Sequence, residues 1–156
     1  MRIALYKGKS WISKAIRWQT RMDYSHAAFV LADGSVIEAW QPCVRHVANL
    51  SIQHTPGTVV DLFAFCRPLS GEQEAMLAAW AVKQCGINYD YRSILRFVTR
   101  KASDGDRAKW FCSEMVSFGC EDVIGRALLH TEPWRIAPGH IAWSTELFHE
   151  STTTTQ

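Results

Sequence analysis

The sequence contains no long apolar run. No stretch of its 156 residues approaches the roughly 18 consecutive apolar residues of a membrane-spanning helix. The N-terminal segment 1–20, MRIALYKGKSWISKAIRWQT, also lacks the uninterrupted apolar stretch of a signal peptide. We therefore expect a cytoplasmic protein, which would reach another compartment only after lysis of the cell or in a phage particle.

Paired cysteines and clustered histidines are missing as well. The five cysteines form no CxxC pair, and their odd number cannot close entirely into disulfides: Cys43, Cys66, Cys85, Cys112 and Cys120. The six histidines are scattered without the paired spacing of a zinc site: His26, His46, His54, His130, His140 and His149. We expect free thiols, no metal and no cofactor.

Acidic residues are absent from residues 1–22, although this segment carries six lysines and arginines. With Trp11 and Trp18 it forms a basic amphipathic segment, which could contact anionic lipid or nucleic acid. The favoured interpretation is a surface helix with a solvated charged face, and membrane contact is the lesser alternative. No nucleic-acid-binding motif is present, so we expect no nucleic acid partner.

What the chain does contain indicates a folded domain. Its residues are 47% hydrophobic, 12% aromatic and 21% charged, a globular composition that excludes general disorder. No internal repeat and no linker is visible. We predict one α+β domain over residues 1–150 and a frayed polar tail at 151–156, STTTTQ.

The first half of the sequence favours strands. An Asp33-Gly34 turn signal separates two β-type runs, which predicts a hairpin. Ser10 is a candidate N-cap for a helix over 11–21. Further β-type runs lie at 2–6, 43–47 and 58–67.

The second half favours helices. Ser70 and Gln73 have capping-box spacing, and the helix that they begin should end near Gly86. A short helix is expected at 89–99 and a polar loop at 100–109. Another helix should begin at Cys112, bury the stripe Cys112, Val116 and Cys120, and end at Gly125 before a loop-rich C-terminal part.

The position of Cys112 suggests a reactive thiol. At a helix N-terminus, unsatisfied backbone N–H groups and the helix dipole favour the thiolate. The other four cysteines fall in strands or at helix ends, where cysteine acts as a small apolar residue. Cys112 is therefore the candidate nucleophile, and it needs a base and a group that orients the base.

His26 and Glu38 flank the predicted hairpin turn and are the candidates for those two roles. A two-residue turn would direct Glu38 to the face opposite His26, whereas a three-residue loop with Gly34 in the left-handed conformation returns both to one face. A catalytic pair therefore requires an odd-length loop. Each residue also has a plain alternative, a structural histidine and an exposed strand glutamate.

Four segments in this order carry a family resemblance: YSHAAFVLADGSVIEAW, GINYDY, WFCSEMV and RIAPGHIA. They resemble the circularly permuted NlpC/P60 papain-like hydrolases, the YiiX/YaeF-like group, over residues 1–145. The resemblance implies a papain-like α+β fold, with an antiparallel sheet packed against helices and the nucleophile at a helix N-terminus. It also implies that Cys112 is the nucleophile, His26 the base and Glu38 the third member of the triad.

The same resemblance adds weaker candidates. GINYDY corresponds to a G-x-P-Y segment near the active site, which makes Tyr89 a candidate hydrogen-bond donor to the oxyanion or substrate, although Asn88 replaces the proline. Tyr24 and Ser25 flank the base and either line the cleft or pack in the strand. The backbone N–H of Cys112 is the safer oxyanion donor, because it requires only the helix N-terminus.

The function implied is hydrolysis of an amide bond in a peptide or a murein peptide through an acyl-enzyme. The first alternative is a lipid acyl hydrolase or acyltransferase of the LRAT-like type, since related folds with the same residue order act on acyl lipids. The second alternative is a binding domain that keeps the fold with an inert thiol.

Overall fold

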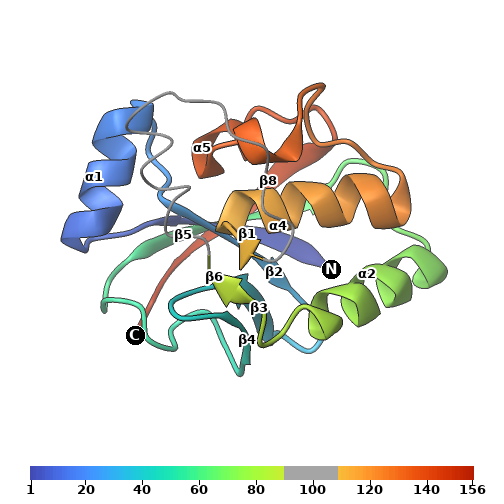
Figure 1. Cartoon of the computed structure of the whole chain (residues 1–156), viewed down its shortest axis with the longest axis horizontal. Coiled ribbons are helices and arrows are strands. Elements are labelled where there is room, and N and C mark those ends of the chain that lie inside the picture. Colours follow the sequence, from blue (N-terminus) through green and yellow to red (C-terminus); the bar gives the residue numbers. More distant parts are fainter. Residues whose placement is uncertain (90–108) are drawn as a thin grey trace.

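The computed structural model describes residues 1–89 and 109–156. Its centre is a six-stranded antiparallel sheet with the strand order β4-β3-β2-β1-β5-β8 (Figure 1). The strands are β1 (Arg2–Lys7), β2 (His26–Val30), β3 (Val36–Ala39), β4 (Val44–Val47), β5 (Val59–Phe65) and β8 (Leu147–Thr154).

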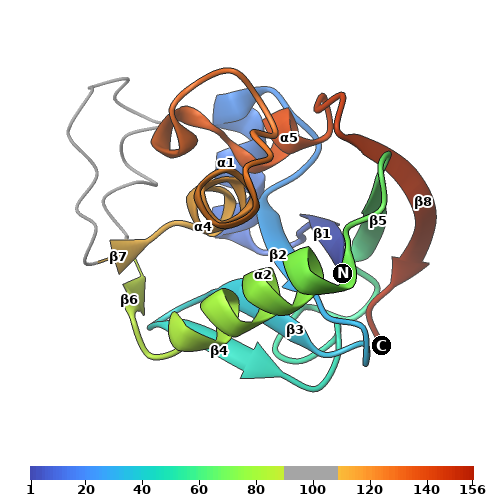
Figure 2. The same cartoon turned by 90° about the vertical axis from the view of Figure 1, so that its right-hand side faces the viewer.

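Helices pack on one side of this sheet. They are α1 (Trp11–Thr20), α2 (Gly71–Lys83), α4 (Cys112–Phe118), its π-helical continuation η1 (Gly119–Val123), a 3₁₀ turn η2 (Pro133–Arg135) and α5 (Pro138–Ile141). Two short strands, β6 (Asn88–Tyr89) and β7 (Lys109–Trp110), pair in parallel just before α4. Figure 2 shows α2 and α4 on the same side of the curved sheet. No helix among the described residues combines the length and the apolarity that a bilayer crossing requires.

The two faces of the sheet bury different clusters. The helix-covered face contributes alternate strand residues such as Leu5, Ala27 and Phe29, which pack with Cys112 and Met115 of α4. The intervening strand residues form a second cluster on the other face: Ala4, Tyr6, Ala28, Val30, Val36, Val60 and Leu62. This strict alternation assigns every strand side chain to one of two environments.

Local capping signals confirm the predicted helix starts. The Ser10 side chain accepts a hydrogen bond from the Ser13 N–H at the start of α1. Ser70 and Gln73 form the reciprocal capping box of α2. Both helices begin where the sequence predicts, since these bonds involve residues only three positions apart.

The hairpin between β2 and β3 has the odd-length loop that a catalytic pair requires. Val30 pairs with Val36, and the Leu31 N–H bonds the Ser35 carbonyl at 2.8 Å, which leaves Ala32 to Gly34 as a three-residue loop. Gly34 has φ +85°, the left-handed conformation that a side chain disfavours. The loop length therefore confirms the register in which His26 and Glu38 share a face.

The prediction of a frayed tail at 151–156 is wrong. Residues 151–154 continue β8 and pair with β5, and Thr155 is buried, with its N–H bonded to the Thr58 carbonyl at 3.0 Å. Polar threonines suit this edge strand because its residues after Leu147 are exposed up to Thr154. The predicted helix at 89–99 and the loop at 100–109 lie almost wholly outside the described residues.

We expect a chain that ends at Glu150 to be less stable than the full chain by about 2 kcal/mol or more, since each lost backbone hydrogen bond contributes about 1 kcal/mol. Urea unfolding measures the difference. A chain that lacks only Gln156 is the control; it loses one exposed hydrogen bond, from the Gln156 N–H to the Ser51 Oγ, and should lose at most about 1 kcal/mol. Equal stability of the Glu150-terminated chain would contradict the role of the final strand.

Candidate active site

A buried carboxylate organises the site. Glu38, on β3, has no exposed surface, and its Oε2 accepts hydrogen bonds from Nε2 of His26 at 2.6 Å and Nε2 of His54 at 3.1 Å. Its Oε1 accepts two from Arg45, at 2.9 Å from Nε and 2.6 Å from Nη2. The predicted His26–Glu38 pair is thus formed, within a larger group of charges.

Aromatic rings enclose this group of charges. The Tyr6 ring stacks on His54 with centroids 4.2 Å apart, and Trp40 meets both histidines edge to face, at 4.9 Å from His26 and 4.6 Å from His54. The Arg45 guanidinium lies 4.9 Å over the Trp40 ring. The Tyr6 hydroxyl is fully buried and has no hydrogen-bond partner. These rings exclude water, which strengthens the ion pairs that they surround.

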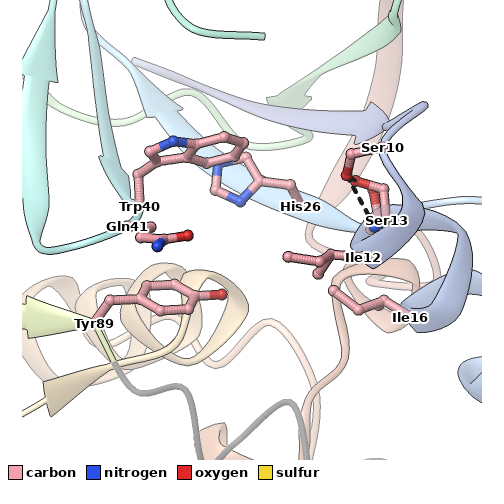
Figure 3. A pocket seen from close by; sticks show the side chains of 9 residues that line it. Ser10, Ile12, Ser13, Ile16, His26, Trp40, Gln41 and Tyr89 are labelled. Atoms are coloured by element: carbon pink, nitrogen blue, oxygen red, sulfur yellow. Dashed lines mark hydrogen bonds between the residues drawn. The ribbon is translucent and has the colours of Figure 1, made fainter. Parts of the chain in front are cut away.

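His26 also lines a small pocket of about 120 Å³. Figure 3 shows the His26 ring beside the Trp40 indole, with Ile12 and Ile16 across the pocket and Tyr89 on a third side. Pockets that enclose a whole drug-sized ligand span about 300–1,000 Å³. The described lining therefore suits one end of a substrate, and that lining is largely apolar.

Cys112 stands at the first position of α4, as predicted, and is buried in the helix-side core. Its thiol lies near the backbone of Ala27 on β2, one residue from His26, and this backbone favours the ionised thiol. Among the described residues, no hydrogen bond joins the thiol to the His26 ring. Ala27 faces the helices, whereas the His26 ring contacts Tyr6 and Glu38 of the other face.

The protonation state of the thiol differs from the expected one. Burial raises the pKa of Cys112 to about 12, and hydrogen bonds from the backbone of Ala27 and Ser113 offset only part of that rise. A helix N-terminus was expected to favour the thiolate, but loss of solvation outweighs it here. Without substrate, Cys112 is therefore a protonated thiol at neutral pH.

The pKa values of both partners of the pair are lowered, for different physical reasons. Burial lowers the pKa of His26, although Glu38 acts against that shift. Burial alone would raise the pKa of Glu38, but the hydrogen bonds from His26 and His54 hold it well below its usual range. A charged carboxylate only accepts hydrogen bonds, so Nε2 of His26 carries the proton and Nδ1 is the basic nitrogen.

The structure places two of the three weaker candidates at the pocket beside His26 and the third away from it. Tyr89 and Ser25 line the pocket with His26, and the Ser25 Oγ accepts from the Gly8 N–H at 3.1 Å. Tyr24 does not line this pocket, because its hydroxyl is bonded to Asp61 at 2.7 Å beside Phe63. Of the two alternatives for Tyr24, these contacts with β5 favour packing over a place in the pocket beside His26.

The sequence-based search missed Arg45 and His54. Arg45 lies directly across from Glu38 in the β3–β4 pair, so a correct hairpin register would have revealed it as a cross-strand partner of opposite charge. His54 comes from the irregular connection between β4 and β5 and follows no spacing rule. Only the folded chain brings it to Glu38.

The scattered histidines include one group of possible metal ligands. Ligand atoms of His26, Glu38 and His54 lie within 4.8 Å of one another. Two imidazoles and a carboxylate match the ligands that Zn²⁺ prefers in proteins. His26 and His54 thus come together in the fold, although their spacing in the sequence gives no sign of it.

Comparison with known proteins shows a shared fold. No family model matches the chain, and no curated protein matches it in sequence. Among solved structures, it resembles the metalloprotein YiiX from Escherichia coli O157:H7, which belongs to DUF1105, with a TM-score of 0.73 and 19% identity. The match covers 97% of this chain and 96% of YiiX. The chain thus has a YiiX-like α+β fold with an antiparallel six-stranded sheet.

We expect the free energy of unfolding to fall as the pH is lowered from about 7.5 to about 5.5. Unfolded His26 takes up a proton near its ordinary pKa of about 6.5, whereas the buried ring does not, so the unfolded state binds more protons and gains stability. Urea unfolding at several pH values measures the slope. His26→Gln should reduce the slope, with a remainder from His140, whose pKa burial also lowers, and the exposed control His46→Gln should leave it unchanged.

Proposed function

We propose that this protein is a cysteine-dependent acyl hydrolase with Cys112 as nucleophile, His26 as base and Glu38 as the group that orients the base. The observation that carries the proposal is the buried 2.6 Å pair of His26 and Glu38. It lies at the start of the strand that the Cys112 thiol contacts through Ala27. A buried carboxylate that orients a histidine, with a helix-terminal thiol packed near the next residue of the same strand, supports nucleophilic catalysis.

In the proposed reaction, Nδ1 of His26 removes the thiol proton as Sγ of Cys112 attacks the acyl carbon. A new S–C bond forms, and the leaving group departs with the proton from His26. Water activated by His26 then cleaves the thioester, releases the acid and restores the thiol. Because the resting thiol is protonated, the proton moves during attack, when substrate brings thiol and imidazole within hydrogen-bond reach.

Negative charge develops on the acyl oxygen during the attack, and hydrogen-bond donors must stabilise it. The first N–H groups of α4 have no intrahelical acceptor, which makes the backbone N–H of Cys112 the main candidate. The Tyr89 hydroxyl is the second candidate, because Tyr89 lines the pocket with His26. Glu38 keeps the imidazolium stable until the leaving group takes its proton.

A permuted papain-like fold is the finer description that we propose. The order of histidine, acid and cysteine along the chain supports it, as does the placement of Cys112 at the first position of a helix packed on an antiparallel sheet. The similarity to YiiX supports the same topology at the level of the fold.

The substrate class that we favour is an amide, in a peptide or a murein peptide. The rival is an acyl lipid, favoured by the apolar side chains that line the pocket, Ile12, Ile16 and Trp40. Both substrates would yield an acyl group on Cys112. The mass of that adduct distinguishes them.

We expect incubation with muropeptides to give a mass adduct on Cys112, and incubation with lipid extracts to give none. Cys112→Ser should lower turnover about 10³-fold or more, because the thiolate is the attacking group. Intact mass spectrometry and product analysis measure both. Cys66→Ser is the matched control, since Cys66 is an exposed free thiol and should not affect turnover.

Two other results would change the assignment. An adduct only from lipid extracts would move the substrate to acyl lipids while keeping the triad. Full activity of Cys112→Ser, or no adduct with either extract, would favour a binding domain with an inert thiol.

Metal binding is a second candidate function, favoured by the His26–Glu38–His54 group and by the fold shared with a metalloprotein. The donors fit a zinc-like ion: Arg45 occupies only Oε1 of Glu38, and the buried Tyr6 hydroxyl lacks a partner. A bound ion there would supply a Lewis acid. Both candidates use His26 and Glu38, but only metal binding needs His54.

We expect His54→Gln to separate the two candidates. If the group binds metal, the parent and Cys112→Ser should bind Zn²⁺ with equal affinity, and His54→Gln should bind it at least about tenfold more weakly. Calorimetry with the apo-protein and elemental analysis measure this. Equal binding by His54→Gln and the parent would exclude this metal site, and it would leave the hydrolase proposal intact.

A further inference from the structure

The outer side of α1 carries an unusual pair of side chains. Trp11 is 79% exposed and Trp18 is 80% exposed. They are seven residues apart, so they project from the same side of the helix, with the exposed Lys14 between them. We call Trp11, Lys14, Ala15 and Trp18 the outer face of α1. The opposite side is occupied, since Ile16 is buried and Ile12 lines the pocket beside His26.

Burial within the chain does not account for these tryptophans. Single exposed apolar residues are common, but two large indoles at this exposure on one helix side are not needed for packing. Figure 1 shows α1 at one end of the molecule, apart from α2 and α4. A third exposed tryptophan, Trp143 at 67%, lines a surface hollow with Arg21 at the C-terminal end of α1.

The charged residues in and before α1 are all basic. Residues 1–22 hold six lysines and arginines and no acid, and the exposed Asp23 is the first carboxylate. Lys7 forms an ion pair with Asp61, and Arg2 forms one with Glu150. By contrast, Lys9, Lys14 and Arg21 have no carboxylate partner among residues 1–89 and 109–156.

We propose that the outer face of α1 docks on the surface of an anionic lipid bilayer. Tryptophan favours the water–lipid interface, where its ring is apolar and its N–H stays hydrated. Unpaired lysines and arginines are attracted to anionic headgroups. A nucleic acid is a poorer match, because a single convex helix side offers no groove along which a phosphate backbone could run.

Docking in this way has one consequence for the pocket. Ile12 and Ile16 line it from the inner side of the helix whose outer side contacts lipid. The pocket beside His26 would then open close to the membrane surface. The position of the pocket matters only if the protein is the proposed hydrolase. Lipid binding by the outer face of α1 does not depend on that proposal.

The test is sedimentation of the full chain with vesicles. We expect binding to vesicles with one third phosphatidylglycerol in phosphatidylcholine, weaker binding to pure phosphatidylcholine, and loss of binding at high salt. Trp11→Ala combined with Trp18→Ala should weaken binding about tenfold or more, and so should Lys9→Glu combined with Lys14→Glu. Turnover of a soluble substrate should not change in either variant.

The matched control is Met76→Ala combined with Val82→Ala, which removes two apolar side chains of α2 that are 47% and 45% exposed. This variant should bind like the parent. Circular dichroism and urea unfolding check that the variants are folded, and the lysine pair tests the surface even if the tryptophan pair does not fold. The proposal is overturned if the parent does not bind anionic vesicles. It is also overturned if the folded tryptophan and lysine variants bind like the parent. It is also overturned if the surface binds only a single-stranded oligonucleotide.

Discussion

Burial of one charged carboxylate is the constraint on which the rest of this site depends. Glu38 is fully enclosed, and a lone buried carboxylate would be very unfavourable. Two histidines and Arg45 compensate, and they come from β2, from β4 and from the connection between β4 and β5. The carboxylate therefore ties three segments together and fixes the ring of His26. The same contacts that stabilise the fold orient the proposed base.

A second constraint acts on the thiol. Cys112 is held between the start of α4 and β2, where burial opposes ionisation more strongly than the helix terminus favours it. The thiol packs in the helix-side cluster with Ala27, whereas the imidazole contacts Tyr6 and Glu38, which belong to the other face. In the proposed chemistry, the reactive ion pair is formed with the substrate and is not stored in the resting enzyme.

Much of the fold follows from short-range signals. Ser10 and the Ser70–Gln73 box gave the starts of two helices, and Asp33-Gly34 gave the hairpin, because each involves hydrogen bonds or dihedrals within a few residues. The length of the hairpin loop, and with it the register, stayed open. The final strand was missed because polar threonines carry no apolar alternation. Its stability comes from pairing with β5, far away in the chain.

The candidate site likewise has features that follow from local sequence and features that depend on the whole fold. The sequence by itself determined that Cys112 begins a helix, since a helix start is a local property, whereas it placed His26 and Glu38 on one face only on condition of an odd-length loop. Only the tertiary structure decided that Arg45 and His54 share the carboxylate, that Tyr24 turns to Asp61, and that the Cys112 thiol is buried. Partners and solvation depend on segments that meet only when the whole chain packs. No local pattern encodes them.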